Sequence, residues 1–145
     1  MRKQGVLAAS YEVEVPFHDV DLAGVVWHGH YVKYLENARW AVMNRIGFGL
    51  DAMVASGFLW PVVGMQVKYI RAARYGDRLS IHASMVEWES RLVINYLLLD
   101  TKDNTRVGRA QTVQVAVERA TGTLQLVSPA CLTELVQAAL NNEAR

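Results

Sequence analysis

The chain has 145 residues, of which 52% are hydrophobic and 20% are charged. This length excludes a second domain with its own catalytic core, and the hydrophobic content excludes a disordered chain. Fifteen basic and fourteen acidic residues give a net charge of +1, so neither nucleic acid nor an anionic membrane is an expected partner. We therefore expect one domain spanning residues 1–145.

The first predicted elements are a strand, a loop and a long helix. Residues 10–17 alternate polar and apolar side chains, which predicts a half-buried strand. Pro16 lacks an amide hydrogen and requires an edge, a bulge or the strand's end at that point. Residues 18–29 form a loop. From residue 31 to residue 46 the apolar spacing is helical over most of the circumference, which predicts a helix buried by the rest of the fold.

Most of the remaining chain is predicted to be strand. A closing helix begins after Ser128 and Pro129, which have the cap-plus-proline signature of a helix start. Short turns between the later strands require antiparallel pairing, so the order indicates an α+β fold with a meander of about four strands. The predicted strand runs are 63–69, 79–85, 92–100 and 106–118.

Further expectations follow from the predicted elements and the composition. One sheet around one helix leaves edges and a face uncovered, which favours a homodimer or a dimer of dimers. Cys131 is the only cysteine, which excludes an internal disulfide. Residues 1–10 lack the apolar run of a signal peptide, and no stretch reaches the roughly 18 apolar residues of a membrane span. We expect a cytoplasmic location.

The loop before the long helix is the candidate site, because it gathers three of the four histidines and two aspartates. Its apolar segment, residues 22–27, is expected to be buried and to bring the flanking polar groups toward a dry pocket. Asp21 is the leading catalytic candidate, since a carboxylate that faces a carbonyl carbon can attack it or activate a water. The alternative is that Asp21 caps a turn through its own backbone.

The start of the helix supplies the complementary group. The first amides of a helix have no internal partner, and the positive end of the helix dipole lies behind them. The backbone amides of His28 and Gly29 are therefore a candidate oxyanion hole, and Gly29 would allow a substrate to approach the backbone closely. The alternative for Gly29 is an ordinary turn glycine.

A metal site is a weaker hypothesis for the same loop. His28 and His30, with Asp19 or Asp21 as a third ligand, have suitable donor atoms for zinc or iron. However, two histidines at i, i+2 spacing match no strong ligand pattern, so we expect no metal.

Three other side chains have both a structural and a functional interpretation. Glu36 either pairs with Lys33 or Arg39 on an exposed helix face, or recognises substrate if that face borders a pocket. Trp27 and Trp60 either pack in the core or line a pocket for an acyl or aryl group.

Residues 18–31, HDVDLAGVVWHGHY, and residues 34–39, YLENAR, resemble the active-site loop and central helix of the 4-hydroxybenzoyl-CoA thioesterase family of hotdog-fold proteins. In that pattern two aspartates flank one residue, and a small pair, a β-branched pair, an aromatic residue and a tyrosine follow. Residues 75–77, YGD, are a weaker marker. The resemblance implies a hotdog fold: an antiparallel sheet of about five strands wrapped around the long helix, with a C-terminal helix.

The same resemblance implies an acyl-CoA thioesterase that releases a carboxylic acid and free coenzyme A. Asp21 is then the general base or nucleophile, and His28 contributes a backbone amide and an assisting side chain. Coenzyme A, or an acyl carrier protein, enters only as part of the substrate, and no cofactor is implied. Phe17 stands where some members have tyrosine, which leaves the acyl group open. The implied substrate-binding residues are Glu36, Trp27, Gly24 and Tyr31.

Two other functions stay open. One is a hotdog dehydratase or hydratase acting on acyl thioesters through His28 and Glu36. The other is a non-catalytic module that binds acyl-CoA or an acyl carrier protein. The aspartate argues against the module, because binding alone does not require a carboxylate at the thioester carbonyl.

Overall fold

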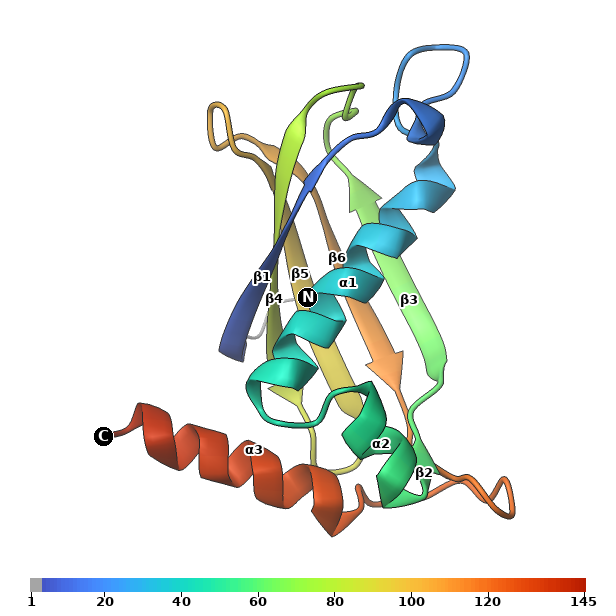
Figure 1. Cartoon of the computed structure of the whole chain (residues 1–145), viewed down its shortest axis with the longest axis vertical. Coiled ribbons are helices and arrows are strands. Elements are labelled where there is room, and N and C mark those ends of the chain that lie inside the picture. Colours follow the sequence, from blue (N-terminus) through green and yellow to red (C-terminus); the bar gives the residue numbers. More distant parts are fainter. Residues whose placement is uncertain (1–3) are drawn as a thin grey trace.

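A computed structural model describes residues 4–145, so Met1–Lys3 at the beginning of the predicted domain lie outside the described part. Single 3-10 turns at Phe17–Asp19 and His28–His30 flank the predicted loop (Figure 1). The other elements, in chain order, are β1 (Val6–Glu14), α1 (Tyr31–Arg45), α2 (Leu50–Ser56), β2 (Phe58–Leu59), β3 (Val62–Tyr69), β4 (Arg78–Glu87), β5 (Leu92–Asp100), β6 (Arg106–Gln114), β7 (Val117–Glu118) and α3 (Ala130–Glu143).

Five strands form an antiparallel sheet in the order β1-β4-β5-β6-β3, and β2 pairs with β7 separately. The predicted meander is confirmed for β4, β5 and β6. It is wrong for β3, which lies at the far edge beside β6, with Met65 opposite Thr112. Alternation and turn residues are the same for either neighbour, so the sequence pattern does not determine which strand β3 joins. This order leaves β3 as an edge strand.

The first strand begins and ends earlier than predicted. It stops at Glu14 because Pro16 has no amide hydrogen to donate, and Phe17–Asp19 then turns toward α1. Near its start the pairing with β4 shifts register between Val6 and Ala9, where Leu7 adopts a positive φ of 55°. This irregularity is a local bulge that the alternating pattern does not reveal.

The long run predicted at residues 106–118 is two strands. Backbone pairing with β3 ends at Gln114, whose side-chain amide donates to the Trp60 carbonyl over 2.5 Å. The chain then leaves the main sheet, and Val117–Glu118 pairs with β2. The break positions Trp60 and Gln114 beside the second half of α1.

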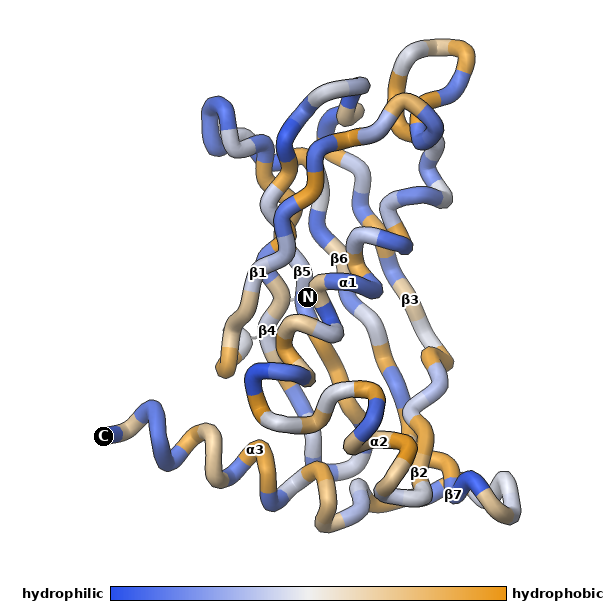
Figure 2. The backbone as a smooth tube through the Cα atoms, in the orientation of Figure 1, coloured by the Kyte–Doolittle hydropathy of each residue, from blue (hydrophilic) through white to orange (hydrophobic). Residues whose placement is uncertain are grey.

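The core lies between α1 and the sheet that curves around it (Figure 1). Hydrophobic and hydrophilic residues alternate along β4, so one face of this strand packs against the helix, whereas β5 is hydrophobic along most of its length (Figure 2). Burying a leucine or isoleucine contributes about 1.5–3 kcal/mol, and this apolar contact holds α1 against the sheet. Fully buried contributors include Leu35, Ala38 and Val42 from α1 and Leu79, Ile81 and Met85 from β4.

The five-stranded antiparallel sheet around a long helix, with α3 at the C-terminal end, confirms the α+β hotdog architecture implied by the resemblance. Arg45 near the end of α1 pairs with Glu143 near the end of α3, and Leu132 and Val136 bury the inner side of α3. Among residues 4–145, no helix is both long enough and apolar enough to cross a membrane.

Candidate active site

The loop between β1 and α1 is a tight hairpin that projects beyond the start of α1 (Figure 1). Asp21 N–H donates to the Val25 carbonyl over 2.9 Å, and Gly24 N–H donates to the Asp21 carbonyl over 2.9 Å. Gly24 has a φ of +78°, which favours glycine. A Cβ atom added at Gly24 would meet no neighbouring atom within 4 Å, so nothing approaches this residue closely. Glycine is therefore needed here for the backbone conformation of the turn.

The expectation that residues 22–27 are buried is wrong. Leu22 is fully exposed and Trp27 is 48% exposed, whereas Val26 is buried and donates its N–H to the Ala73 carbonyl over 2.8 Å. The hairpin turns outward, so only its returning arm reaches the core. Exposed apolar side chains therefore surround the candidate site in a single copy of the chain.

Asp21 lies in the exposed part of this hairpin. One carboxylate oxygen, Oδ1, accepts the Ala23 N–H over 2.8 Å, which is the turn-capping contact considered above. This contact fixes the orientation of the carboxylate and leaves Oδ2 without a hydrogen bond to any residue of the described part. The turn and the catalytic interpretations are compatible, because a capped carboxylate still has a free oxygen.

The start of α1 has the predicted free amides. The 3-10 turn His28–His30 continues into α1, and His30 N–H donates to the Trp27 carbonyl over 2.9 Å. His28 and Gly29 precede that first bond, and within residues 4–145 neither amide has a backbone acceptor. Their N–H groups form the positive end of the helix, where an oxyanion would be stabilised.

Gly29 is required for a reason the sequence did not indicate. A Cβ atom at this position would lie 2.2 Å from Cζ3 of Trp27, so any side chain would displace the indole ring. The ring also lies 5.0 Å from the His28 ring and 5.2 Å from the His30 ring. Trp27 therefore covers the start of the helix and does not pack in the core.

Two further candidates near the start of α1 have distinct positions. His28 is exposed, and its carbonyl accepts the Tyr69 hydroxyl over 2.8 Å, which joins the start of the helix to β3. Tyr31 is buried, and its hydroxyl accepts the Ala73 N–H over 3.1 Å. Burial raises the pKa of the Tyr31 hydroxyl above its ordinary value. A groove of about 290 Å³ runs between these two residues and Tyr69.

Asp19, two residues before Asp21, is only 1% exposed. Its carboxylate accepts hydrogen bonds from Lys33 Nζ at 2.6 Å and from the Tyr34 hydroxyl at 2.5 Å. Burial raises the pKa of the Asp19 carboxyl, but the bonds from Lys33 and Tyr34 outweigh burial, and the pKa lies below its ordinary value. Burial and the Asp19 carboxylate raise the pKa of the Tyr34 hydroxyl, which stays a donor.

These contacts disfavour the metal hypothesis. Lys33 and Tyr34 bind the Asp19 carboxylate, and His30 Nδ1 approaches it only to 4.0 Å. Across residues 4–145, no three histidine, cysteine, aspartate or glutamate side chains are grouped so that they could hold a metal ion.

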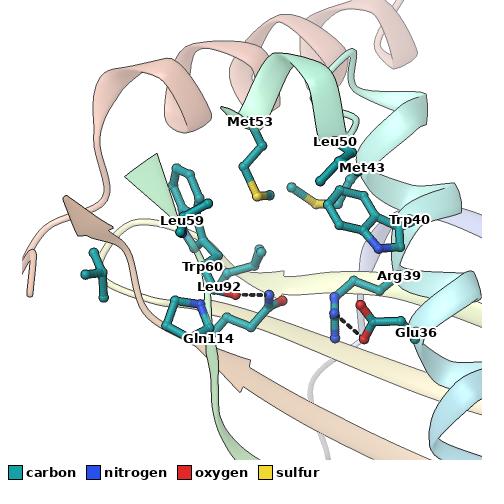
Figure 3. A pocket seen from close by; sticks show the side chains of 12 residues that line it. Glu36, Arg39, Trp40, Met43, Leu50, Met53, Leu59, Trp60, Leu92 and Gln114 are labelled. Carbon is teal, nitrogen blue, oxygen red and sulfur yellow. Dashed lines mark hydrogen bonds and ion pairs between the residues drawn. The ribbon is translucent and has the colours of Figure 1, made fainter. Parts of the chain in front are cut away.

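The second half of α1 borders a largely apolar cavity of about 360 Å³ (Figure 3). Glu36 and Arg39 both line it and pair with each other, so the structural interpretation of Glu36 is confirmed, and its helix face does border a pocket. The Arg39 side chain is 8% exposed and the Glu36 side chain is 47% exposed, which places the pair at the polar edge of the cavity. The apolar part includes Trp40, Met43, Leu50, Met53, Leu59 and Trp60.

Most of this cavity was not predicted. Glu36 and Trp60 were candidates, whereas Arg39, Trp40 and Met43 were not, although they follow Glu36 at i+3, i+4 and i+7. This helical spacing is the available signal, because such residues share one face. The contributions of Met53 and Gln114 come from α2 and β6, and no local pattern relates those elements to α1.

Comparison with known proteins gives the family. Residues 15–140 match the model of the thioesterase-like superfamily. The chain belongs to this superfamily. A putative esterase of Synechocystis, sll0410, is 32% identical over 129 residues, covering 84% of this chain and 74% of that protein.

Two further similarities involve proteins with more specific names. The acyl-CoA thioester hydrolase YbgC of Escherichia coli O6:H1 is 28% identical over 108 residues, covering 74% of this chain and 81% of that protein. The structure of Slr0204, a 1,4-dihydroxy-2-naphthoyl-CoA thioesterase from Synechocystis, superposes with a TM-score of 0.80. It is 21% identical and covers 95% of this chain and 98% of that one, which establishes similarity of fold.

Proposed function

We propose that this chain is an acyl-CoA thioesterase in which Asp21 acts as general base or nucleophile and the His28 and Gly29 amides form the oxyanion hole. One observation carries the proposal: the hydrogen bond between the Asp19 carbonyl and Trp27 N–H, 3.0 Å long, closes the hairpin that holds Asp21 at the start of α1. The same closure directs the acid and the free amides to one end of the molecule. Superfamily membership and relatives named as thioester hydrolases support the reaction class.

The chemistry needs few groups. In the general-base form, Asp21 takes a proton from a water molecule while the water oxygen bonds to the thioester carbon. The amides stabilise the resulting oxyanion. The oxyanion then collapses and the C–S bond breaks, which releases the carboxylic acid. The departing thiolate takes the proton held by Asp21, which gives the coenzyme A thiol and restores the carboxylate. A single oxyanion-hole donor typically lowers the activation barrier by about 3–4 kcal/mol. A thiolate is a good leaving group and departs without a strong general acid.

The acyl group is proposed to occupy the cavity lined by Glu36 and Arg39. Glu36, Trp27 and Tyr31 are then the substrate-binding residues near the acyl path, and Gly24 acts through the turn. In one chain the cavity is distant from the helix start, because the eight residues from His28 to Glu36 correspond to about 12 Å of helix.

A homodimer removes that separation. The edge strand β3 has exposed side chains on both faces: Met65 (43% exposed) and Tyr69 (49% exposed) on one, and Gln66 and Lys68 on the other. Antiparallel pairing of β3 with the same strand of a second copy would satisfy this edge. The end of β3 at Tyr69, which contacts His28, would then face the start of the partner's β3, beside the partner's cavity. The proposed site is therefore shared between two copies, in a dimer or a dimer of dimers.

The alternative function, a dehydratase or hydratase that uses His28 and Glu36, has no supporting geometry. Glu36 pairs with Arg39 in the cavity, and the His28 ring lies against Trp27 at the helix start. A non-catalytic module would leave the free amides and the oriented carboxylate without a role.

The cytoplasm, the compartment expected from the sequence, is where we propose that the enzyme acts.

The experiment that tests the proposal is a thiol-release assay over acyl-CoAs of different length and aromaticity, with Asp21→Asn beside wild type. Because Asp21 is exposed and an asparagine oxygen can still accept the Ala23 N–H, the variant should fold normally. We expect turnover to fall about 10²- to 10⁴-fold. Asp51→Asn, which changes an exposed aspartate on α2, is the matched control. Full activity of the Asp21 variant would exclude Asp21 as the general base or nucleophile. Binding without hydrolysis by wild type would favour the non-catalytic module.

A further inference from the structure

We propose that Asp19 is the positioning residue of the active site, which fixes the oxyanion amides relative to Asp21. The inference rests on the proposed thioesterase function but concerns a residue that does not touch the substrate. Asp19 is 1% exposed, and both of its carboxylate oxygens accept hydrogen bonds within the protein. It therefore has neither the access nor the free oxygen that a reacting group needs.

Asp19 joins three successive segments of the chain. Its N–H donates to the Pro16 carbonyl over 3.1 Å, which secures the turn after β1. Its carbonyl accepts the Trp27 N–H over 3.0 Å, which closes the hairpin. Its carboxylate binds Lys33 at 2.6 Å and Tyr34 at 2.5 Å, both in the first turn of α1. One residue thus connects the end of β1, the returning arm of the hairpin and the helix.

The position of these contacts links them to the reaction. Trp27 immediately precedes His28 and Gly29, so its N–H bond to Asp19 sets where their amides lie. Asp21 follows Asp19 by two residues on the outgoing arm of the same hairpin. A shift of Asp19 therefore changes the separation between the Asp21 carboxylate and the His28 and Gly29 amides. A displacement of about 1 Å can lower the rate about 10²-fold.

The surroundings of Asp19 explain why the carboxylate form is needed. Lys33 and Tyr34 donate from α1, and His18 Nε2 lies 3.7 Å and His30 Nδ1 lies 4.0 Å from Asp19 Oδ1. Each of these four groups is a donor or a potential cation. A neutral amide would direct its own N–H toward one of these donors and lose that contact.

The first test is Asp19→Asn, with Thr112→Val as the matched control. The control removes another buried hydroxyl bond, between Thr112 and Tyr96 at 2.8 Å on the central strands. For Asp19→Asn we expect kcat to fall about 10²-fold while KM stays within about threefold, because acid and amides are misplaced but the acyl cavity is intact. The control should lose thermal stability with kcat within about threefold of wild type. Wild-type kcat in Asp19→Asn, or a loss confined to KM, would overturn the inference.

Amide hydrogen exchange gives a readout that does not depend on activity. Asp19→Asn should increase exchange of the hydrogen-bonded amides of Val26, Trp27 and His30 by at least about tenfold, because the returning arm of the hairpin loses its link to α1 through the Asp19 carboxylate. Thr112→Val should leave their exchange unchanged. Unchanged exchange in Asp19→Asn would overturn the inference whether or not wild type hydrolyses acyl-CoA. Absence of hydrolysis by wild type would instead refute the proposed function alone. If Asp21→Asn were active, the proposed role of Asp21 and its positioning by Asp19 would both fail, and the exchange data would test only whether Asp19 fixes the amides.

Discussion

The two halves of α1 contribute to the proposed site in different ways. The start of the helix is fixed by directed polar contacts: Lys33 and Tyr34 with Asp19, and the His28 carbonyl with Tyr69. The second half, from Glu36 to Met43, borders an apolar cavity in which one ion pair is the main polar feature. Hydrogen bonds specify position within tenths of an ångström, whereas apolar surfaces tolerate changes of shape. Substitutions at the start should therefore change kcat, and those at the cavity should change KM and acyl preference.

The largest expected effect comes from breaking the dimer, which would bring the start of α1 in one copy beside the cavity of the other. Val63→Lys with Met65→Lys puts charges on β3 where it would pair with its own copy, so we expect a folded monomer with thiol release reduced to background. Light scattering and the thiol assay on the same sample measure both properties. Leu126→Lys, at a position 82% exposed outside β3, is the control. A fully active monomer would refute the shared site.

The next effect tests the start of the helix alone. Gly29→Ala places a methyl group within 2.2 Å of the Trp27 ring, so either the ring or the amides must move. We expect kcat to fall about 10²-fold. Combining it with Trp27→Ala, which removes the ring, should recover part of the loss relative to Trp27→Ala alone. A Gly29→Ala enzyme with wild-type kcat would show that the amides are not critically placed.

A smaller effect tests the cavity half. Leu50→Trp adds a large side chain at a cavity-lining position that is 60% exposed, so folding should be preserved. We expect KM for long or bicyclic acyl groups to rise about tenfold, with kcat for short acyl groups unchanged. Val54→Trp, on α2 but outside the cavity lining, is the matched control. Equal effects of the two variants would place the acyl group elsewhere.

The smallest effect is on acid stability. The pKa of Asp19 is lower in the folded chain than its unfolded value of about 4. Asp19 therefore contributes stability that is present above pH 4 and is lost as the pH falls through the folded pKa. Lys33→Met removes one bond that lowers this pKa while burial still raises it, so the midpoint of acid unfolding should move to higher pH. Circular dichroism during acid titration measures the shift, and an unchanged midpoint would show that Lys33 does not stabilise the carboxylate.

The sequence predicted much of the fold because α1 and the later strands have clear periodicities. Residues 31–46 have helical spacing, and α1 spans Tyr31–Arg45. The neighbour of β3 was missed, since pairing across the sheet depends on contacts far apart in the chain. The break at Gln114 was missed because apolar alternation continues through it, although the backbone there turns toward β2.

The candidate site was predicted less completely than the fold. The loop pattern selected Asp21, His28 and Gly29, and the structure places all three at one end of the molecule. Burial of the apolar loop segment was wrong, because hydrophobicity does not show which way a hairpin turns. Asp19 was considered only as a metal ligand, since its role depends on Lys33 and Tyr34, which approach it only when α1 folds back beside the loop.

The most direct test of the central claim is a crystal structure of the D21N variant with a bound non-hydrolysable acyl-CoA analogue. We predict the carbonyl oxygen within about 3 Å of the His28 or Gly29 amide nitrogen, with the residue at position 21 facing the carbonyl carbon and the acyl group in a cavity lined by Glu36 and Arg39. A carbonyl bound away from the start of α1 in every copy would contradict the account.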